Sequence, residues 1–244
     1  MLRESPLSNE FLTSVANMSF AITEFFGATF SSNKGEQSAV PLTTLKAISE
    51  DAHIVGTLAL NILASQVFKD LHMLYEAEFF EVRLEERVLP DSIDIFEQVI
   101  DKLSEECARL LMQCFLQRTV AAYIQCLVRS PKKTAMLGHV LVVAKVREDT
   151  SEMKNNFQGY FGAAQLQKSI SHMELVSAFL TDPLDSFTKH IEELQKIPCL
   201  DVTSTILKGL VELRGDSRME KNRAKIEVDA ELQRIKETKE TERM

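Results

Sequence analysis

The sequence contains no tryptophan and few residues that interrupt helices, with 8 glycines and 6 prolines in 244 residues. Aromatic residues make up only 7% of it, whereas hydrophobic residues make up 45% and charged residues 26%. This balance excludes disorder for most of the chain, because the apolar content can form a packed core. Few helix breakers, together with abundant Leu, Glu, Lys, Ala and Gln, predict an all-α protein.

Long apolar runs are also lacking. The longest, Val140 to Ala144, is far shorter than the roughly 20 residues that cross a bilayer. Charged Arg3 and Glu4 follow Met1 where a signal peptide would begin its apolar segment. We therefore expect a soluble protein.

Cysteines are few and unpaired in sequence: Cys107, Cys114, Cys126 and Cys199 include no Cys-x-x-Cys motif. Cys107 and Cys114 occupy apolar positions of a helical pattern. This placement predicts buried free thiols in a reducing compartment.

A basic surplus is missing as well, since the formal net charge is −8 with the two signs interspersed. Nucleic-acid-binding domains usually show the opposite imbalance, so no nucleic-acid partner is expected.

Catalytic and metal-binding motifs are also lacking. No His-Glu-x-x-His or Gly-x-Ser-x-Gly motif occurs, and Gly159-Tyr160-Phe161-Gly162 lacks the Lys-Ser/Thr of a phosphate-binding loop. No histidine lies three or four residues from another; the five are His53, His72, His139, His172 and His190. Adjacent acids are interpreted as solvated helix faces: Glu85-Glu86, Glu105-Glu106 and Glu192-Glu193. We expect no enzyme activity, catalytic residue, metal site or cofactor.

Apolar residues recur at steps of three and four, which predicts helices over 8–30, 41–89 and 93–128. The inward stripe predicted for the first helix is Phe11, Val15, Met18, Ile22 and Phe25, and for the second it is Leu45, Ile48, Ala52, Val55, Ala59 and Ile62. The third carries a packing seam of Ile93, Phe96, Ile100, Leu103, Cys107, Leu110 and Cys114, followed by a shift of phase. We interpret that seam as internal, with a partner protein as the alternative.

Helices are predicted to continue after Pro131. Val140–Val143 could form a strand, but no other segment offers it a partner, so a helix is favoured, with a break at Gly159 or Gly162. Asp182-Pro183 predicts the start of a helix that ends at Pro198. Another helix begins at Asp201 and ends with Gly215 as its C-terminal cap.

The predicted division is an N-terminal helix and loop at 1–40, helical bundles at 41–130 and 131–215, and a charged helix or tail at 216–244. The cluster Arg129, Lys132 and Lys133 lies at a predicted helix end, where basic side chains interact favourably with the helix dipole. A contact with anionic lipid is the alternative.

Three motifs occur in an order that resembles the C-terminal part of the Sec-six family of exocyst subunits, also called exocyst component three. They are Arg118 to Leu127, Thr181-Asp182, and Leu213-Arg214-Gly215-Asp216-Ser217-Arg218 with Lys221. The last lacks one residue of the family pattern between Asp216 and Ser217. The similarity spans about residues 50–221 and leaves 1–40 unmatched.

The resemblance implies an elongated stack of antiparallel helical bundles and a non-enzymatic scaffold that tethers secretory vesicles to the plasma membrane before fusion. It implies other exocyst subunits as partners, with SNARE proteins and an anionic membrane surface as further candidates. The location that it implies is cytoplasmic and peripheral, at the plasma membrane or at secretory vesicles. A membrane-remodelling relative of the M-Sec type and an unrecognised helical enzyme are the alternatives.

Overall fold

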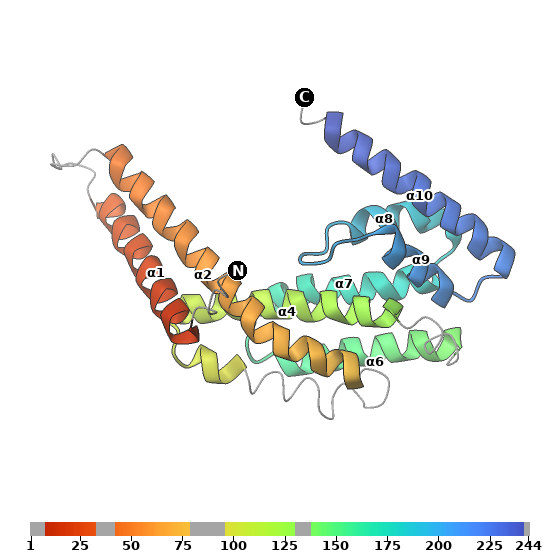
Figure 1. Ribbon diagram of the computed structural model, residues 1–244, viewed down its shortest axis with the longest axis horizontal. Helices are drawn as coiled ribbons and strands as arrows, with labels where there is room; N and C mark the ends of the chain where they lie inside the picture. The colour runs from red at the N-terminus through yellow and green to blue at the C-terminus, as the bar shows by residue number, and fades with distance from the viewer. Residues whose placement is uncertain (1–7, 33–41, 79–95, 130–137, 242–244) are drawn as a thin grey trace, which may run out of the picture. The chain divides into compact units, whose positions relative to one another are not determined.

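The computed structural model describes residues 8–32, 42–78, 96–129 and 138–241 (Figure 1). Every regular element in these ranges is helical, which confirms the all-α prediction. The elements are α1 (Asn9–Ser32), α2 (Leu42–Glu78), α4 (Glu105–Arg129), α6 (His139–Phe157), α7 (Ala163–Thr181), the short 3-10 helix η1 (Leu184–Ser186), α8 (Phe187–Leu194), α9 (Ser204–Leu213) and α10 (Arg218–Thr241). Within these ranges, no helix is both long enough and apolar enough to span a bilayer.

The chain divides into two compact units. Unit 1 comprises Met1–Leu71 and Asp91–Phe115, and unit 2 comprises His72–Pro90 and Leu116–Met244. The domain boundaries predicted at 40, 130 and 215 remain a prediction.

Unit 1 is built on a hairpin of α1 and α2, which run antiparallel (Figure 1). The Phe20 ring packs edge-on against His53 with 5.4 Å between ring centroids. Gly56 lies beneath Phe20, and a Cβ added there would sit 2.8 Å from that ring. One turn away, the Thr23 hydroxyl donates to the carbonyl of Ser49 at 3.5 Å. A residue without a side chain at 56 therefore lets the two helices approach closely.

The predicted inward stripe of α1 is wrong. Phe11, Met18 and Phe25 are 54%, 62% and 66% exposed, whereas the buried positions are Leu12, Thr13, Ala16, Ser19 and Phe20. The stripe predicted for α2 also fails at Ile48 and Val55, which are exposed. Small residues form much of the contact between the helices, so the bulkiest periodic stripe was not the buried one.

The continuous helix predicted over 93–128 is also wrong, because the backbone leaves the helix at residues 101–104. The Asn17 amide of α1 stabilises this break by donating to the Lys102 carbonyl at 2.9 Å and accepting from the Ser104 amide at 2.8 Å. Ile93, the first residue of the predicted seam, lies outside the described residues.

Beyond the break, the buried face of α4 differs from the predicted seam. Cys107, Leu111 and Phe115 are buried, while Leu110 and Cys114 are only half-buried. The Phe115 ring stacks on Phe96 with 3.7 Å between centroids. The predicted burial of Cys107 is thus confirmed, and that of Cys114 is wrong.

Unit 2 has its core where α4, α6 and α7 present apolar faces. Val120, Tyr123, Ile124 and Leu127 of the Arg118–Leu127 motif are all buried. Val140–Val143, for which a strand was the alternative, lie in the first turns of α6. The helix prediction is therefore confirmed, and the strand alternative is wrong. The predicted break falls between Phe157 and Ala163 and includes both Gly159 and Gly162.

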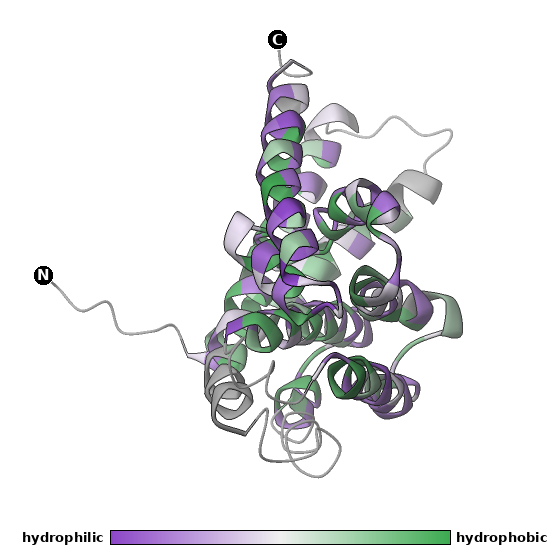
Figure 2. Ribbon diagram, turned by 90° about the vertical axis from the view of Figure 1, so that its right-hand side faces the viewer, coloured by the Kyte–Doolittle hydropathy of each residue, from purple (hydrophilic) through white to green (hydrophobic). Residues whose placement is uncertain are grey.

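The C-terminal helix, α10, packs against α9 within unit 2. Ala224 and Val228 of α10 are buried, and Asp229 accepts hydrogen bonds from Ser204 and Lys208 of α9 at 2.7 and 2.6 Å. The helix leading to the C-terminus is largely hydrophilic with narrow apolar patches (Figure 2). A thin apolar stripe and ion pairs therefore position this charged helix.

Burial should make the cysteines react at very different rates. The thiolate is the reactive form, and burial raises the pKa of Cys126 to about 11 and also raises that of Cys107. Cys199 is exposed. We expect a maleimide to label Cys199 first and to reach Cys107 and Cys126 only under denaturing conditions, as read by mass spectrometry. Equal labelling rates at the three thiols would contradict the described core.

Candidate functional site at the Arg214 junction

Two of the motifs that carry the family resemblance meet at one buried point of unit 2. Arg214, which follows α9, is 4% exposed, and its guanidinium reaches back to the end of α7. There Nη2 donates to the Asp182 carbonyl at 2.7 Å, and Nη1 donates to the Phe179 carbonyl. The last carbonyls of a helix have no partner within the helix, so Arg214 supplies donors that α7 lacks.

The buried charge of Arg214 is balanced locally. Its Nε pairs with the carboxylate of Asp216, two residues along the chain, whose side chain is 22% exposed. A buried guanidinium is tolerated when its hydrogen bonds are satisfied and a countercharge is close. Arg214 meets both conditions, because its hydrogen bonds go to the Phe179 and Asp182 carbonyls and its countercharge is Asp216.

Gly215 is required by a close contact and not by its backbone angles. A Cβ added at Gly215 would lie 2.9 Å from Cδ2 of His139, at the start of α6. The His139 Nδ1 is 3.1 Å from the Leu213 carbonyl, the last of α9. Gly215 does not adopt a positive φ, so its predicted role as a left-handed C-terminal cap is wrong.

The motif continues directly into a capping box for α10. The Ser217 amide donates to the Glu220 carboxylate at 2.9 Å, and the Glu220 amide donates to the Ser217 hydroxyl at 3.3 Å. These hydrogen bonds lower the pKa of Glu220. One short segment therefore ends α9, anchors the end of α7 and starts α10.

Asp182 has a second role in the junction. Its carboxylate is 3.0 Å from Nε2 of His190 on α8, and the His190 ring packs near Phe179. The helix predicted to start at Asp182-Pro183 begins slightly later: Asp182 is the C-cap of α7, η1 begins at Leu184, and α8 follows from Phe187. The cause is that the carboxylate binds His190 instead of capping a new helix.

A second buried polar cluster lies between α4 and α6. The Tyr123 hydroxyl donates to Asp149 at 2.6 Å, and the Lys145 ammonium lies 3.0 Å from the same carboxylate. Asp149 is 4% exposed. Burial is the largest influence on this group and raises its pKa, although Lys145 and Tyr123 act in the opposite direction.

This raised pKa predicts a specific dependence of stability on pH. The folded chain binds the Asp149 proton more tightly than the unfolded chain does, so this stabilisation grows on acidification and is lost as pH rises through the folded pKa. The Asp149→Asn variant has no ionisable carboxyl at this position. Urea unfolding should show wild type gaining stability relative to this variant as pH falls from neutral toward the ordinary carboxyl value of 3.8.

The control for this comparison is Asp185→Asn, at an exposed position of η1. Asp185→Asn should change the free energy of unfolding less than Asp149→Asn does, because the Asp185 side chain is exposed. A stability difference between wild type and Asp149→Asn that stays constant with pH would contradict the prediction.

The other candidate residues do not converge on a reaction centre. Glu106 pairs with Arg109 at 2.6 Å, and Glu193 pairs with Lys196 at the same distance. Burial lowers the pKa of His172. Arg129 is in the last turn of α4, whereas Glu85, Glu86, Lys132 and Lys133 lie outside the described residues. Among the described residues, no group of three or more His, Cys, Asp and Glu side chains could hold a metal ion.

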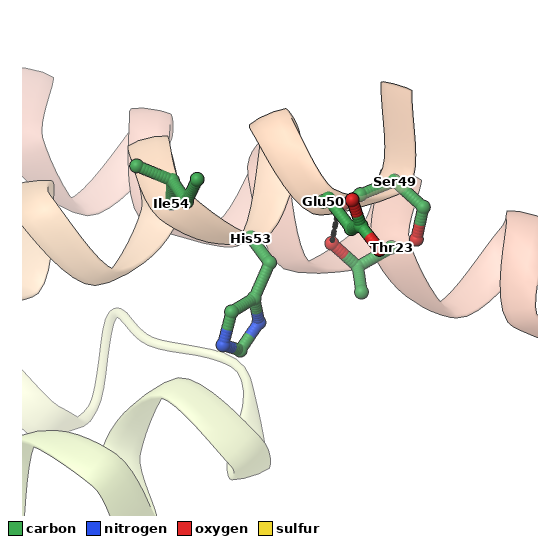
Figure 3. A pocket seen from close by; sticks show the side chains of 5 residues that line it. All are labelled: Thr23, Ser49, Glu50, His53 and Ile54. Carbon is green, nitrogen blue, oxygen red and sulfur yellow. Dashed lines mark hydrogen bonds between the residues drawn. The ribbon is translucent and has the colours of Figure 1, made fainter. Parts of the chain in front are cut away.

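A surface groove of about 420 Å³ lies along the α1–α2 hairpin. Its lining residues are Thr23, Ser49, Glu50, His53 and Ile54 (Figure 3). The Thr23 hydroxyl donates to the carbonyls of Ser19 and Ser49, and His53 packs on Phe20, so both side chains already have structural roles. Such a groove does not present the converging polar groups of an active site.

A comparison with family models gives a match that covers the junction. The family model for the exocyst complex component Sec6 matches residues 4–218, a range that contains Asp182, Arg214, Gly215 and Ser217. The chain belongs to the Sec6 family. The match also includes residues 4–49, so the expectation that the N-terminal stretch lies outside the family pattern is wrong.

The fold of this Sec6-family chain is also known from a solved structure. It is similar to the crystal structure of the C-terminal domain of the exocyst subunit Sec6p, with a TM-score of 0.65 and 15% sequence identity. The similarity covers 95% of this chain and 61% of that one, so this chain spans about three fifths of the solved domain. A comparison with curated proteins found no match.

Sequence reasoning found the junction motif but missed most of its connections. Arg214 was recognised as part of a pattern, yet its burial and its contacts with Phe179 and Asp182 were not predicted. His139 was treated as one of five unrelated histidines. The capping box of Ser217 and Glu220 was also missed, although the sequence carries its signal as Ser-x-x-Glu.

Proposed function

We propose that this chain is a non-enzymatic scaffold subunit of the exocyst that helps tether secretory vesicles to the plasma membrane before fusion. The observation that carries the proposal is the family match over residues 4–218. The shared fold with the Sec6p C-terminal domain supports it. The proposed partners are other exocyst subunits first, then SNARE proteins and an anionic membrane surface, and the proposed location is cytoplasmic and peripheral.

The chemistry of the site agrees with a structural role. The junction uses its charged groups to join helices: Arg214 is occupied by Phe179, Asp182 and Asp216, and Glu220 is occupied by Ser217. Each of these charged groups has a partner within the protein. A scaffold needs helices held in a defined arrangement, and that is what these hydrogen bonds provide.

The test is affinity purification of the tagged full chain from its own cells, followed by quantitative mass spectrometry. Other exocyst subunits should be recovered at comparable molar amounts. Arg214→Ala should reduce their recovery because it disrupts the junction, whereas Arg223→Ala, at an 80% exposed side chain on α10, should leave recovery unchanged.

The proposal fails if the wild-type chain recovers no exocyst subunit and if an exocyst purified through another subunit lacks this chain. Depletion of the chain should also cause secretory vesicles to accumulate beneath the plasma membrane. Normal secretion after depletion would contradict the tethering role.

A further inference from the structure

Helix α10 packs against α8 and α9, and charged side chains form much of this contact (Figure 1). Ser204, Lys208 and Glu212 of α9 follow one another at steps of four residues, so they lie along one side of that helix. Glu192 of α8 lies further along α10, where it pairs with Arg234. We call the surface formed by these four residues of α8 and α9 the α8–α9 face.

Two positions of α10 match the α9 part of this face. Lys225 of α10 pairs with the Glu212 carboxylate. One turn later, the Asp229 carboxylate accepts hydrogen bonds from Lys208 at 2.6 Å and from Ser204 at 2.7 Å. These hydrogen bonds lower the pKa of Asp229, so its carboxylate is charged at neutral pH.

The charges of α10 therefore meet the α8–α9 face in a fixed order. From its N-terminus onward, α10 presents basic Lys225, acidic Asp229 and basic Arg234 to acidic, basic and acidic partners. Opposite charges across a contact fix its register, and a like charge at any of these positions would be repelled. The α8–α9 face is thus complementary to a helix with one particular order of charges.

Apolar burial contributes little to the docking of α10. Among the described side chains of this helix, the fully buried apolar ones are Ala224 and Val228, while Leu232 and Ile235 are half-buried. Burial of apolar surface is the main favourable term in packing, and segments with few buried apolar contacts open at low free energy. Much of the specificity of this contact therefore comes from its ion pairs.

Those ion pairs are accessible to solvent. Across the three pairs that join α10 to α8 and α9, the side chains are 26–55% exposed. Exposed pairs contribute little individually and weaken as the salt concentration rises. We therefore expect α10 to leave the α8–α9 face at a lower free energy than the one that unfolds the core of unit 2.

The extent of the family match separates the face from its cover. The match over residues 4–218 includes α8 and α9, and it ends at Arg218, the first residue of α10. The matched pattern thus contains the α8–α9 face without the helix that covers it in this chain.

We propose that the α8–α9 face is a helix-binding site which α10 fills, and that a helix of a partner protein with the same order of charges replaces α10 there. Such a helix carries a basic residue, an acidic residue four positions later and a second basic residue nine positions after the first, as α10 does. It carries apolar residues next to the first basic residue and next to the acidic one, at the positions of Ala224 and Val228. The proposal goes beyond the exocyst assignment and does not depend on it.

Hydrogen exchange of the full chain, read by mass spectrometry, tests whether α10 is released. Raising the salt concentration from about 0.1 M to about 1 M shortens the screening length from about 10 Å to about 3 Å and should speed exchange at residues 221–235 at least threefold. Exchange in α7, whose core residues are buried, should change less than twofold, which also shows that unit 2 stays folded.

A charge reversal tests the contact itself. Asp229→Lys should speed exchange in α10 at least tenfold at low salt, because the new ammonium faces Lys208. Adding Lys208→Asp should restore protection, since the pair forms again with its signs exchanged. Glu237→Lys is the matched control: it makes the same change of charge on the same helix, at an exposed residue that bonds Gln233 of α10, and should leave exchange unchanged.

A synthetic peptide tests whether the vacated face binds a helix. The probe is a fluorescein-labelled peptide of residues 216–241, and its binding is followed by fluorescence anisotropy. It should bind the full-length Asp229→Lys variant at least tenfold more tightly than the wild-type chain, in which α10 occupies the site for most of the time. A second peptide, in which the residues at 225 and 229 are exchanged, has the same composition and the wrong order of charges, and should bind neither chain.

Three results would overturn the proposal. Unchanged exchange of α10 in Asp229→Lys, or equal acceleration in Glu237→Lys, would show that the ion pairs with α9 do not hold α10. Failure of the first peptide to bind Asp229→Lys, with α10 released and α7 protected, would show that the α8–α9 face is not a helix-binding site. Equal binding of both peptides would show that the face does not select the order of charges.

Discussion

Replacing Arg214 with alanine is expected to destabilise unit 2 by about 3–5 kcal/mol, the range measured when one partner of a buried ion pair is removed. The variant loses the donors to the Phe179 and Asp182 carbonyls at the end of α7 and leaves the carboxylate of Asp216 unpaired. Buried acceptors without donors each cost about 1–3 kcal/mol, which agrees with this range.

Urea unfolding followed by circular dichroism measures the effect. Arg214→Lys should recover little of the loss, since an ammonium group cannot reach three acceptors in one plane as a guanidinium does. Arg223→Ala is the matched control: its exposed pair with Glu227 should contribute less than about 1 kcal/mol. A loss below about 1 kcal/mol in Arg214→Ala would show that the junction does not hold unit 2 together.

Phe96→Ala is expected to destabilise unit 1 by about 3–5 kcal/mol, because it removes a fully buried aromatic side chain and leaves a cavity. Phe96 is 0% exposed and stacks on Phe115 with 3.7 Å between ring centroids, while Phe68 packs edge-on against the other side of the cluster. Phe96→Leu should cost less, since it keeps most of the volume.

The same denaturation series measures this effect. Leu58→Ala, at a 58% exposed position of α2, is the control and should change stability by less than about 0.5 kcal/mol. Similar losses for Phe96→Ala and Leu58→Ala would mean that the cluster around Phe115 is not the core of unit 1.

The helical character of the chain could be predicted because it depends on local properties. Scarce glycine and proline, strong helix formers and apolar steps of three and four predicted helices at α1, α2, α4, α6 and α7, and the structure contains them. The segment at Val140 was correctly assigned as helical because no other segment could pair with it as a strand. Local propensity and periodicity are summed over many residues, so single errors matter little.

Which face of a helix is buried was harder to predict. Along α1, the stripe of Phe11, Met18 and Phe25 is bulkier than the stripe of Leu12 and Ala16, yet the second is buried. The choice depends on the partner: Gly56 lets α2 approach, and a close approach favours small residues on both sides. Such a decision involves two segments at once and cannot be read from the pattern of one.

The helix break at residues 101–104 has the same cause. No glycine or proline marks it, and the apolar pattern continues across it. The exposed backbone groups of Lys102 and Ser104 are satisfied by Asn17, a residue more than eighty positions earlier. A hydrogen bond between distant segments stabilises a conformation for which the local sequence gives no signal.

The sequence by itself determined the fold class and the family motifs, because each depends on residues within a few positions of one another. Only the tertiary structure decided that Arg214 is buried, that its guanidinium joins α9 to the end of α7, and that His139 is the reason for Gly215. The exposure of Phe11, Met18 and Phe25 on α1 was likewise decided by packing. Burial and hydrogen bonding between distant segments depend on which surfaces meet, and that is settled by the free energy of the whole folded chain.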